Sequence, residues 1–153
     1  MYERYKKSKT NAILVMQTIK EIQEAIIEDF DMFEDWMQKY EYLIDLGKDL
    51  ASIDEKHKIE DNLIKGCQSR VWLHAEENKG KILFSADSDA IMTKGIIALL
   101  IRVLSGKSAN DIANADLDFI NKIGLKEQLS ATRANGLLSM IKQMKLYAIA
   151  LNK

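Results

Sequence analysis

The sequence contains no proline, two histidines and one cysteine, Cys67, among its 153 residues. Because proline breaks helix interiors, its complete absence favours long helices over a turn-rich sandwich or barrel. A single cysteine excludes intramolecular disulfides and any metal or iron–sulfur site that needs about four thiolates from one chain. The longest apolar run, residues 96–104 interrupted by Arg102, is far shorter than the roughly 20 residues that cross a bilayer. If the thiol has a role, it is therefore that of a reactive group.

The composition, 47% hydrophobic and 29% charged residues, is that of an ordinary globular domain with its own core. The net charge of −1 hides a separation of acidic and basic side chains along the chain. Residues 21–61 carry four basic and fourteen acidic side chains, whereas residues 62–153 carry thirteen basic and eight acidic ones. This pattern favours a polar protein partner over nucleic acid, which requires one dominant basic surface. No signal-peptide pattern follows the short apolar stretch 12–16, so we expect a cytoplasmic protein that does not associate with membranes.

The organisation predicted along the chain is a flexible extension, residues 1–17, followed by one domain, residues 18–153. Apolar residues from Ile19 to Ile44 recur at the three-and-four spacing of amphipathic helices. Asp31 followed by Glu34 is typical of a helix start, which predicts a break near residues 29–31 and a second helix that ends near Gly47.

A β-hairpin is predicted next, because every second residue is apolar at positions 71, 73 and 75 and again at 82, 84 and 86. The neighbours are more polar apart from Trp72, and the turn-forming Asn78, Lys79 and Gly80 separate the two runs. Two strands alone are marginally stable, so a third strand before Cys67 would complete the sheet. The predicted fold class is α+β, a small antiparallel β-sheet packed against several α-helices.

The second half of the chain is predicted to be helical. Asp87, Ser88 and Asp89 offer cap oxygens to a helix that begins near Ala90 and ends before Gly106. This helix is apolar on nearly every side, which predicts the buried centre of the core. Two short helices follow, bracketed by Ser108 with Asp111 and by Asp116 with Gly124, and Ser130 or Thr132 caps a final helix. Its apolar face consists of Leu137, Ile141, Met144, Ala148 and Leu151.

The lone thiol follows Gly66 where helix-period and strand-period patterns change over, which predicts a loop position. Lys65 and Arg70 add positive charge that would favour the thiolate. The alternative is a buried, purely structural cysteine. A hydrolytic enzyme would need His57 or His74 as a base, and both are more simply explained as structural residues, His57 in a solvent-facing charged stretch.

Arg133 falls in the first turn of the predicted final helix, where a cation opposes the helix dipole. This mild misfit indicates either an anion or partner carboxylate that the arginine meets, or a simply solvated side chain. Gly136 in the same turn lowers helix propensity, and close packing against the hairpin would explain it. Asp87 and Asp89 are better explained as helix caps than as a catalytic pair.

Five blocks in this order resemble the SufE family. They are residues 36–47 (WMQKYEYLIDLG), 66–73 (GCQSRVWL), 87–98 (DSDAIMTKGIIA), 117–125 (LDFINKIGL) and 129–137 (LSATRANGL). The resemblance runs from about Thr18 to the C-terminus. It departs from the family pattern in lacking prolines at positions within residues 51–58 and at Ala131.

The resemblance implies a SufE/IscU-like fold and a sulfur-acceptor protein of iron–sulfur cluster assembly. Such proteins bind a cysteine desulfurase of the SufS type, which uses pyridoxal phosphate, take its sulfane sulfur as a persulfide, stimulate its turnover and pass the sulfur to a SufBCD-like scaffold complex. By position Cys67 matches the acceptor cysteine. Residues that match the partner-binding surface are Arg133, Asp87, Asp89, Gly66, Gln68 and Ser69.

This role is compatible with the residues themselves, since persulfide transfer needs a thiolate that reaches the outer sulfur and no general base of the hydrolase type. The partner supplies the cofactor, so neither a cofactor nor a metal site is expected here. The chain is then a carrier rather than a stand-alone enzyme, and we expect Val71 and Leu73 to help shelter the thiol. A helical adaptor with a structural cysteine and a small cysteine hydrolase remain alternatives.

Overall fold

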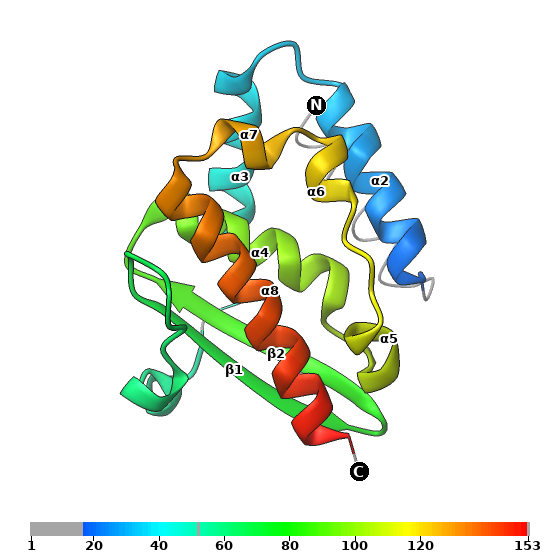
Figure 1. The fold of residues 1–153 in the computed structure, drawn as a ribbon, viewed down its shortest axis with the longest axis vertical. Coiled ribbons are helices and arrows are strands. Elements are labelled where there is room, and N and C mark those ends of the chain that lie inside the picture. The colour runs from blue at the N-terminus through cyan, green and yellow to red at the C-terminus, as the bar shows by residue number, and fades with distance from the viewer. Residues whose placement is uncertain (1–16, 52, 153) are drawn as a thin grey trace.

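A small antiparallel β-sheet and a set of helices surround one long, apolar helix in the computed structural model, which describes residues 17–51 and 53–152 (Figure 1). This arrangement is the predicted α+β class. Of the predicted N-terminal extension, residues 1–16 lie outside the described part. The backbone carbonyl of Gln17 accepts a hydrogen bond of 2.6 Å from Nζ of Lys107. No described helix is both long enough and apolar enough to cross a membrane.

The first two helices are α2 (Ile19–Asp31) and α3 (Trp36–Lys48). Thr18 begins α2 with a capping box in which its side chain and that of Glu21 each bond the other's backbone N–H. The predicted break between two helices is present but follows residue 31. The helix α2 extends this far because Phe30 belongs to its buried face and is only 1% exposed. The expected helix start at Asp31 is wrong. The cap of α3 is Asp35, whose side chain accepts from the N–H of Gln38.

The predicted hairpin is confirmed as β1 (Val71–Asn78) and β2 (Lys81–Ser88), whose register runs from the pair Val71 and Ser88 to the pair Asn78 and Lys81. The turn between them has positive φ at Lys79 and Gly80, the geometry of the tight turns that match strand twist. The prediction of a third strand before Cys67 is wrong. The third strand is β3 (Lys107–Ser108), on the other edge of β2, and only a single bridge joins Leu63 to Trp72.

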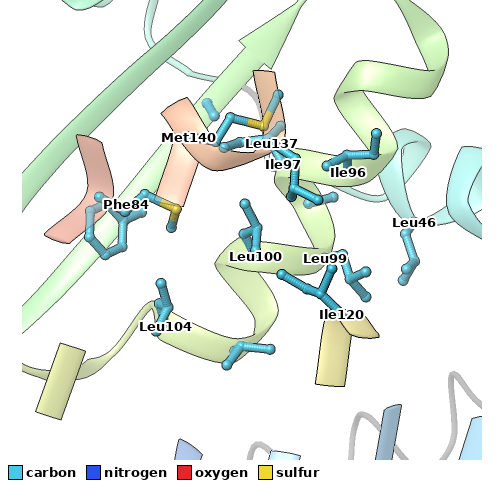
Figure 2. Close-up of a cluster of buried hydrophobic side chains, with 14 of the residues drawn as sticks. Leu46, Phe84, Ile96, Ile97, Leu99, Leu100, Leu104, Ile120, Leu137 and Met140 are labelled. Atoms are coloured by element: carbon cyan, nitrogen blue, oxygen red, sulfur yellow. The ribbon is translucent and has the colours of Figure 1, made fainter. Parts of the chain in front are cut away.

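The long apolar helix is α4 (Ile91–Leu104), and its predicted place at the centre of the core is confirmed. Figure 2 shows its side chains reaching neighbours from every side, with Phe84 of β2, Ile120, and Leu137 among the residues around them. Two glycines let α3 approach α4 closely. A Cβ on Gly95 would collide with the carbonyl oxygen of Leu43, and one on Gly47 would lie 2.9 Å from the backbone nitrogen of Gly95.

The remaining helices frame this core. They are the 3₁₀ turns η1 (Glu55–His57) and η2 (Glu60–Asn62), the short helices α5 (Ala109–Ala113), α6 (Phe119–Lys122) and α7 (Leu125–Gln128), and the final helix α8 (Ala131–Leu151). The predicted caps Ser108 and Ser130 are confirmed, each accepting from the backbone N–H three residues on. The prediction missed α7, a single turn that begins after Gly124 with φ of 73°.

Candidate functional site

The thiol of Cys67 lies on a tight loop, residues 65–70, which we call the Cys67 loop. Its base is closed by the N–H of Ile64, which donates to the carbonyl oxygen of Val71 at 2.9 Å. Gly66 makes the turn possible, since it has φ of 92° and a Cβ there would lie 2.5 Å from Oγ of Ser139. The loop thereby places Cys67 against α8.

The Cys67 thiol contacts the backbone of α8 at Gly136. Its Sγ donates to the carbonyl oxygen of Gly136 over 3.6 Å, and a Cβ on Gly136 would lie 3.3 Å from that sulfur. Close packing therefore does explain this glycine, but the expected partner is wrong: Gly136 packs against the Cys67 loop rather than the hairpin. Without a side chain at position 136, the sulfur approaches the helix backbone directly.

A small cavity of about 70 Å³ adjoins the thiol, between the Cys67 loop and the first turns of α4 and α8. Its wall includes Ile96 and Met140, both buried. The expectation that Val71 and Leu73 shelter the thiol is wrong, because both side chains are fully buried in the core on the hairpin's inner face and neither lines the cavity. The shelter comes instead from two helices distant in sequence.

Burial raises the pKa of the Cys67 thiol above its usual value. The expectation that Lys65 and Arg70 promote the thiolate is wrong, since both side chains are exposed and burial is the cause of the shift. At neutral pH the resting sulfur is therefore a protonated thiol. Its reactivity must increase when the surroundings of the loop change.

The polar rim of the cavity contains three of the residues singled out from the sequence. Gln68 and Ser69 line it from the loop, and Arg133 lines it from α8, where its backbone N–H bonds Oγ of Ser130 at 3.2 Å. Arg133 is exposed, so its guanidinium can meet an external anion. The fold thus brings an arginine 66 positions away in sequence to the mouth of the thiol cavity.

Asp87 and Asp89 do not cap α4, contrary to the expectation. Cross-strand pairing keeps this segment extended, and the cap position is Ala90, which makes no side-chain cap bond. Asp89 instead accepts from the N–H of Arg70 at 3.0 Å and donates its own N–H to the carbonyl oxygen of Arg70 at 3.2 Å. Oγ of Ser88 donates to the same carbonyl at 2.8 Å. These bonds fasten the end of the Cys67 loop.

Asp87 forms an ion-pair cluster beneath that connection. Its carboxylate lies 2.8 Å from Nζ of Lys58 and 3.2 Å from Nζ of Lys94. Burial alone would raise the pKa of Asp87, but hydrogen bonds from Lys58, the N–H of Ser88 and Lys94 outweigh it and hold the pKa below its usual value. Neither Asp87 nor Asp89 lines the thiol cavity.

The two histidines stack on each other rather than on the thiol. The rings of His57 and His74 are nearly parallel, with centroids 3.6 Å apart, and both residues are partly buried. The expected solvent exposure of His57 is therefore wrong. Neither histidine lines the cavity of Cys67. Within residues 17–51 and 53–152 no group of three or more His, Cys, Asp or Glu side chains is placed to hold a metal ion.

Comparison with known proteins decides the family. Residues 24–148 match the model of the SufE family, described as an Fe-S metabolism associated domain. The chain belongs to the SufE family.

Curated SufE-like relatives match most of the chain. An uncharacterized SufE-like protein of Rhizobium meliloti is 41% identical over 127 residues, which cover 80% of this chain and 91% of the relative. One from Synechocystis is 36% identical over 140 residues, covering 92% and 88% respectively. SufE-like protein 1, chloroplastic/mitochondrial, of Arabidopsis thaliana is also 36% identical, and its match covers 89% of this chain and 38% of that longer protein.

The fold has a solved counterpart. The solution structure of a hypothetical protein from Thermus thermophilus superposes with a TM-score of 0.72 over 85% of this chain and 95% of that one, at 18% identity. Membership of the SufE family gives this protein a role in Fe-S metabolism.

One buried residue at this SufE site was missed from the sequence. Thr93, in the first turn of α4, is 6% exposed and lines the cavity of Cys67. The available signal was its position: a hydroxyl three residues before Ile96 lies on the same face of an apolar helix. What the sequence did not indicate is that this face meets the thiol.

Proposed function

We propose that this SufE family member accepts sulfane sulfur on Cys67 from a cysteine desulfurase that uses pyridoxal phosphate, and delivers it for iron–sulfur cluster assembly. The observation that carries the proposal is the placement of the chain's one thiol, half-buried beside a cavity whose mouth is formed by Gln68, Ser69 and Arg133. A structural cysteine would need no such cavity and no cation beside it.

The proposed transfer is an exchange at sulfur. The Cys67 thiolate attacks the outer sulfur of the donor's cysteine persulfide; a bond forms from Sγ to that sulfur, and the donor's sulfur–sulfur bond breaks. The donor leaves as a thiolate, which takes up the proton that Cys67 gave up, and Cys67 becomes a persulfide. No net oxidation occurs, so the step needs no redox partner.

Docking must change the Cys67 loop, because the resting thiol is protonated and partly covered. We propose that the desulfurase meets Arg133 and the loop residues Gly66, Gln68 and Ser69, and that the loop moves to expose the sulfur. Asp87 and Asp89 act indirectly by holding the loop in place. Asp87 does so through its ion pairs with Lys58 and Lys94, and Asp89 through its hydrogen bond to the backbone of Arg70. Binding in this mode would also stimulate turnover, since it removes the sulfur product from the donor.

A SufBCD-like scaffold complex is the proposed recipient of the sulfur. We also propose a cytoplasmic location, since the cytosol keeps a lone thiol reduced. Cell fractionation tests the location. Recovery of the protein chiefly with membranes or in an oxidising compartment would overturn it.

The deciding experiment is intact-protein mass spectrometry after incubation with a cysteine desulfurase and free cysteine, with Cys67→Ser as the control. We expect the wild type, and not the variant, to gain the mass of one sulfur atom, and a reductant to remove it. A wild type that gains no sulfur while still binding and stimulating the desulfurase would favour a helical adaptor with a structural cysteine. A hydrolase is disfavoured, because neither histidine lines the thiol cavity.

A further inference from the structure

We propose that the cavity beside Cys67 receives the outer sulfur of the Cys67 persulfide and that the hydroxyl of Thr93 is its hydrogen-bond donor. The inference rests on the proposed function and assigns to Thr93 a contact that only the sulfur-loaded protein makes. The state concerned is the persulfide-loaded protein, after it has accepted sulfur from the desulfurase and before it passes the sulfur on.

Thr93 is an unusual wall residue, because its hydroxyl is buried without a partner. It is 6% exposed, and no hydrogen bond joins its side chain to any residue within 17–51 and 53–152. A buried hydroxyl that forms no hydrogen bond destabilises a protein, so such groups normally find an acceptor. The cavity that Thr93 shares with Cys67 is the place where that acceptor would arrive.

The cavity has room for such an acceptor. Its volume of about 70 Å³ exceeds the roughly 10–15 Å³ that a single water needs, so one additional sulfur atom fits beside Sγ. Ile96 and Met140 supply an apolar wall, which suits a large, polarisable and weakly hydrated atom.

The electrostatics favour a sulfur anion in the cavity over one at Sγ. Sγ of Cys67 faces the carbonyl oxygen of Gly136, an acceptor that favours the protonated thiol. The cavity adjoins the first turns of two long helices, with Thr93 contributed by α4 and Arg133 by α8. Amino ends of helices carry partial positive charge, and α4 has no side-chain cap to offset it. The outer sulfur of a persulfide thus meets donors where the parent thiol meets an acceptor.

The test compares Thr93→Val with Thr132→Val, which makes the same chemical change at an exposed position on the cavity rim. Wild type and both variants are loaded with inorganic polysulfide, so that loading does not depend on a partner. The rate at which iodoacetamide alkylates the persulfide is then followed against pH by mass spectrometry. We expect Thr93→Val to raise the pH midpoint by about one unit, a tenfold change in proton affinity, and Thr132→Val to leave it unchanged. An unchanged midpoint in Thr93→Val overturns the inference.

Thermal unfolding of the unloaded proteins separates this contact from a structural role. If the Thr93 hydroxyl has no partner until sulfur arrives, Thr93→Val should melt at the same temperature as the wild type or higher. A clear fall in melting temperature would show that the hydroxyl already has a structural partner, which overturns the inference. Loading by polysulfide but not by any desulfurase would overturn the proposed function instead, and the midpoint shift would still decide the role of Thr93.

Discussion

The carbonyl oxygen of Gly136 accepts the thiol of Cys67 at 3.6 Å, and a Cβ on that glycine would stand 3.3 Å from the same sulfur. Position 136 therefore sets how deeply the thiol sits. Glycine weakens the first turns of α8 by about 1 kcal/mol relative to alanine. A glycine is nevertheless suited to this position, because the sulfur packs directly on the helix backbone there.

Replacing Gly136 with alanine should push the thiol outward. A contact of 3.3 Å is tighter than ordinary packing, so Cys67 must shift by a few tenths of an ångström. Because burial is what raises the pKa of this thiol, we expect Gly136→Ala to move the pKa back toward its usual value. Reaction with an aromatic disulfide reagent at pH 8 should become several-fold faster. The unfolding free energy should change by no more than about 1 kcal/mol, because the gain in helix propensity opposes the cost of the tight contact.

Asn135→Ala is the matched control for that prediction. It improves helix propensity at the neighbouring exposed position without approaching the sulfur. Its thiol should react at the wild-type rate. Equal reaction rates for Gly136→Ala and wild type would show that the loop does not yield at this contact.

Much of the framework was predictable because local patterns and tertiary burial agree. The apolar alternation through β1 and β2 and the apolar surface of α4 both come from side chains that pack into one core. Ser108 and Ser130 cap helices through hydrogen bonds to the backbone N–H three residues on, which are local contacts. Asp87 and Asp89 show where local patterns fail. Their spacing is equally suited to a helix cap, but Asp87 pairs with Trp72 of β1 and Asp89 bonds the backbone of Arg70 in the Cys67 loop, and these contacts decide the outcome.

The candidate site was predictable only in part, and its arrangement was not. Cys67 and Arg133 were identified from the sequence, yet their shared cavity depends on how α8 crosses the Cys67 loop, which no local pattern encodes. The same applies to the thiol's protonation. Lys65 and Arg70 are near in sequence, but their side chains are exposed to solvent, and burial determines the shift.

Asp87→Asn should loosen the segment that precedes the Cys67 loop. The carboxylate joins Lys58 of that segment to Lys94 of α4, with side chains only 24% and 34% exposed. Once the charge is lost, Lys58 keeps its 3.0 Å pair with Glu55, whose side chain is 84% exposed and holds it less firmly. Trypsin should then cleave after Lys58 several-fold faster, as measured by peptide mass fingerprinting over time. Asp54→Asn is the control, since the Asp54 pair with Lys56 spans 3.8 Å between exposed side chains and contributes little. Equal cleavage rates in the two variants would contradict a tethering role for Asp87.

Stability should fall as the solution is acidified from about pH 6.5, because of His74. Burial, and then the neighbouring His57, lower the pKa of His74 below its ordinary value of 6.5. The unfolded chain therefore binds a proton at a higher pH than the folded one, so the contribution of His74 is complete above pH 6.5 and is lost as the pH falls through the folded value. Asp87, whose folded pKa is also lowered, adds its loss only below about pH 4.

His74→Phe tests this assignment, because it keeps an aromatic ring for the stack with His57 and removes the titrating group. Urea unfolding at pH 7.5 and pH 5.5 gives the change in unfolding free energy between the two values. We expect that change to be smaller in His74→Phe than in wild type. An identical change would assign the acid sensitivity to other groups.

Arg133→Ala should separate partner activation from stability. Its guanidinium is exposed at the mouth of the thiol cavity, and as a cation in the first turn of α8 it opposes the helix dipole. Removing it should therefore leave the melting temperature unchanged or slightly raised. Binding to the desulfurase should weaken by about tenfold, since one charge-assisted hydrogen bond contributes about 1.5 kcal/mol.

The measurement is desulfurase turnover at sub-saturating concentrations of wild type, Arg133→Ala and Lys142→Ala. Lys142 is an exposed cation of the same helix that does not line the cavity, so its removal controls for net charge. Only Arg133→Ala should need a higher concentration for half-maximal stimulation. Raising the ionic strength should reduce the difference in this concentration between Arg133→Ala and wild type, since salt screens exposed charges. Equal loss in both variants would indicate long-range attraction rather than a contact at the thiol, and wild-type stimulation by Arg133→Ala would remove this residue from the docking surface.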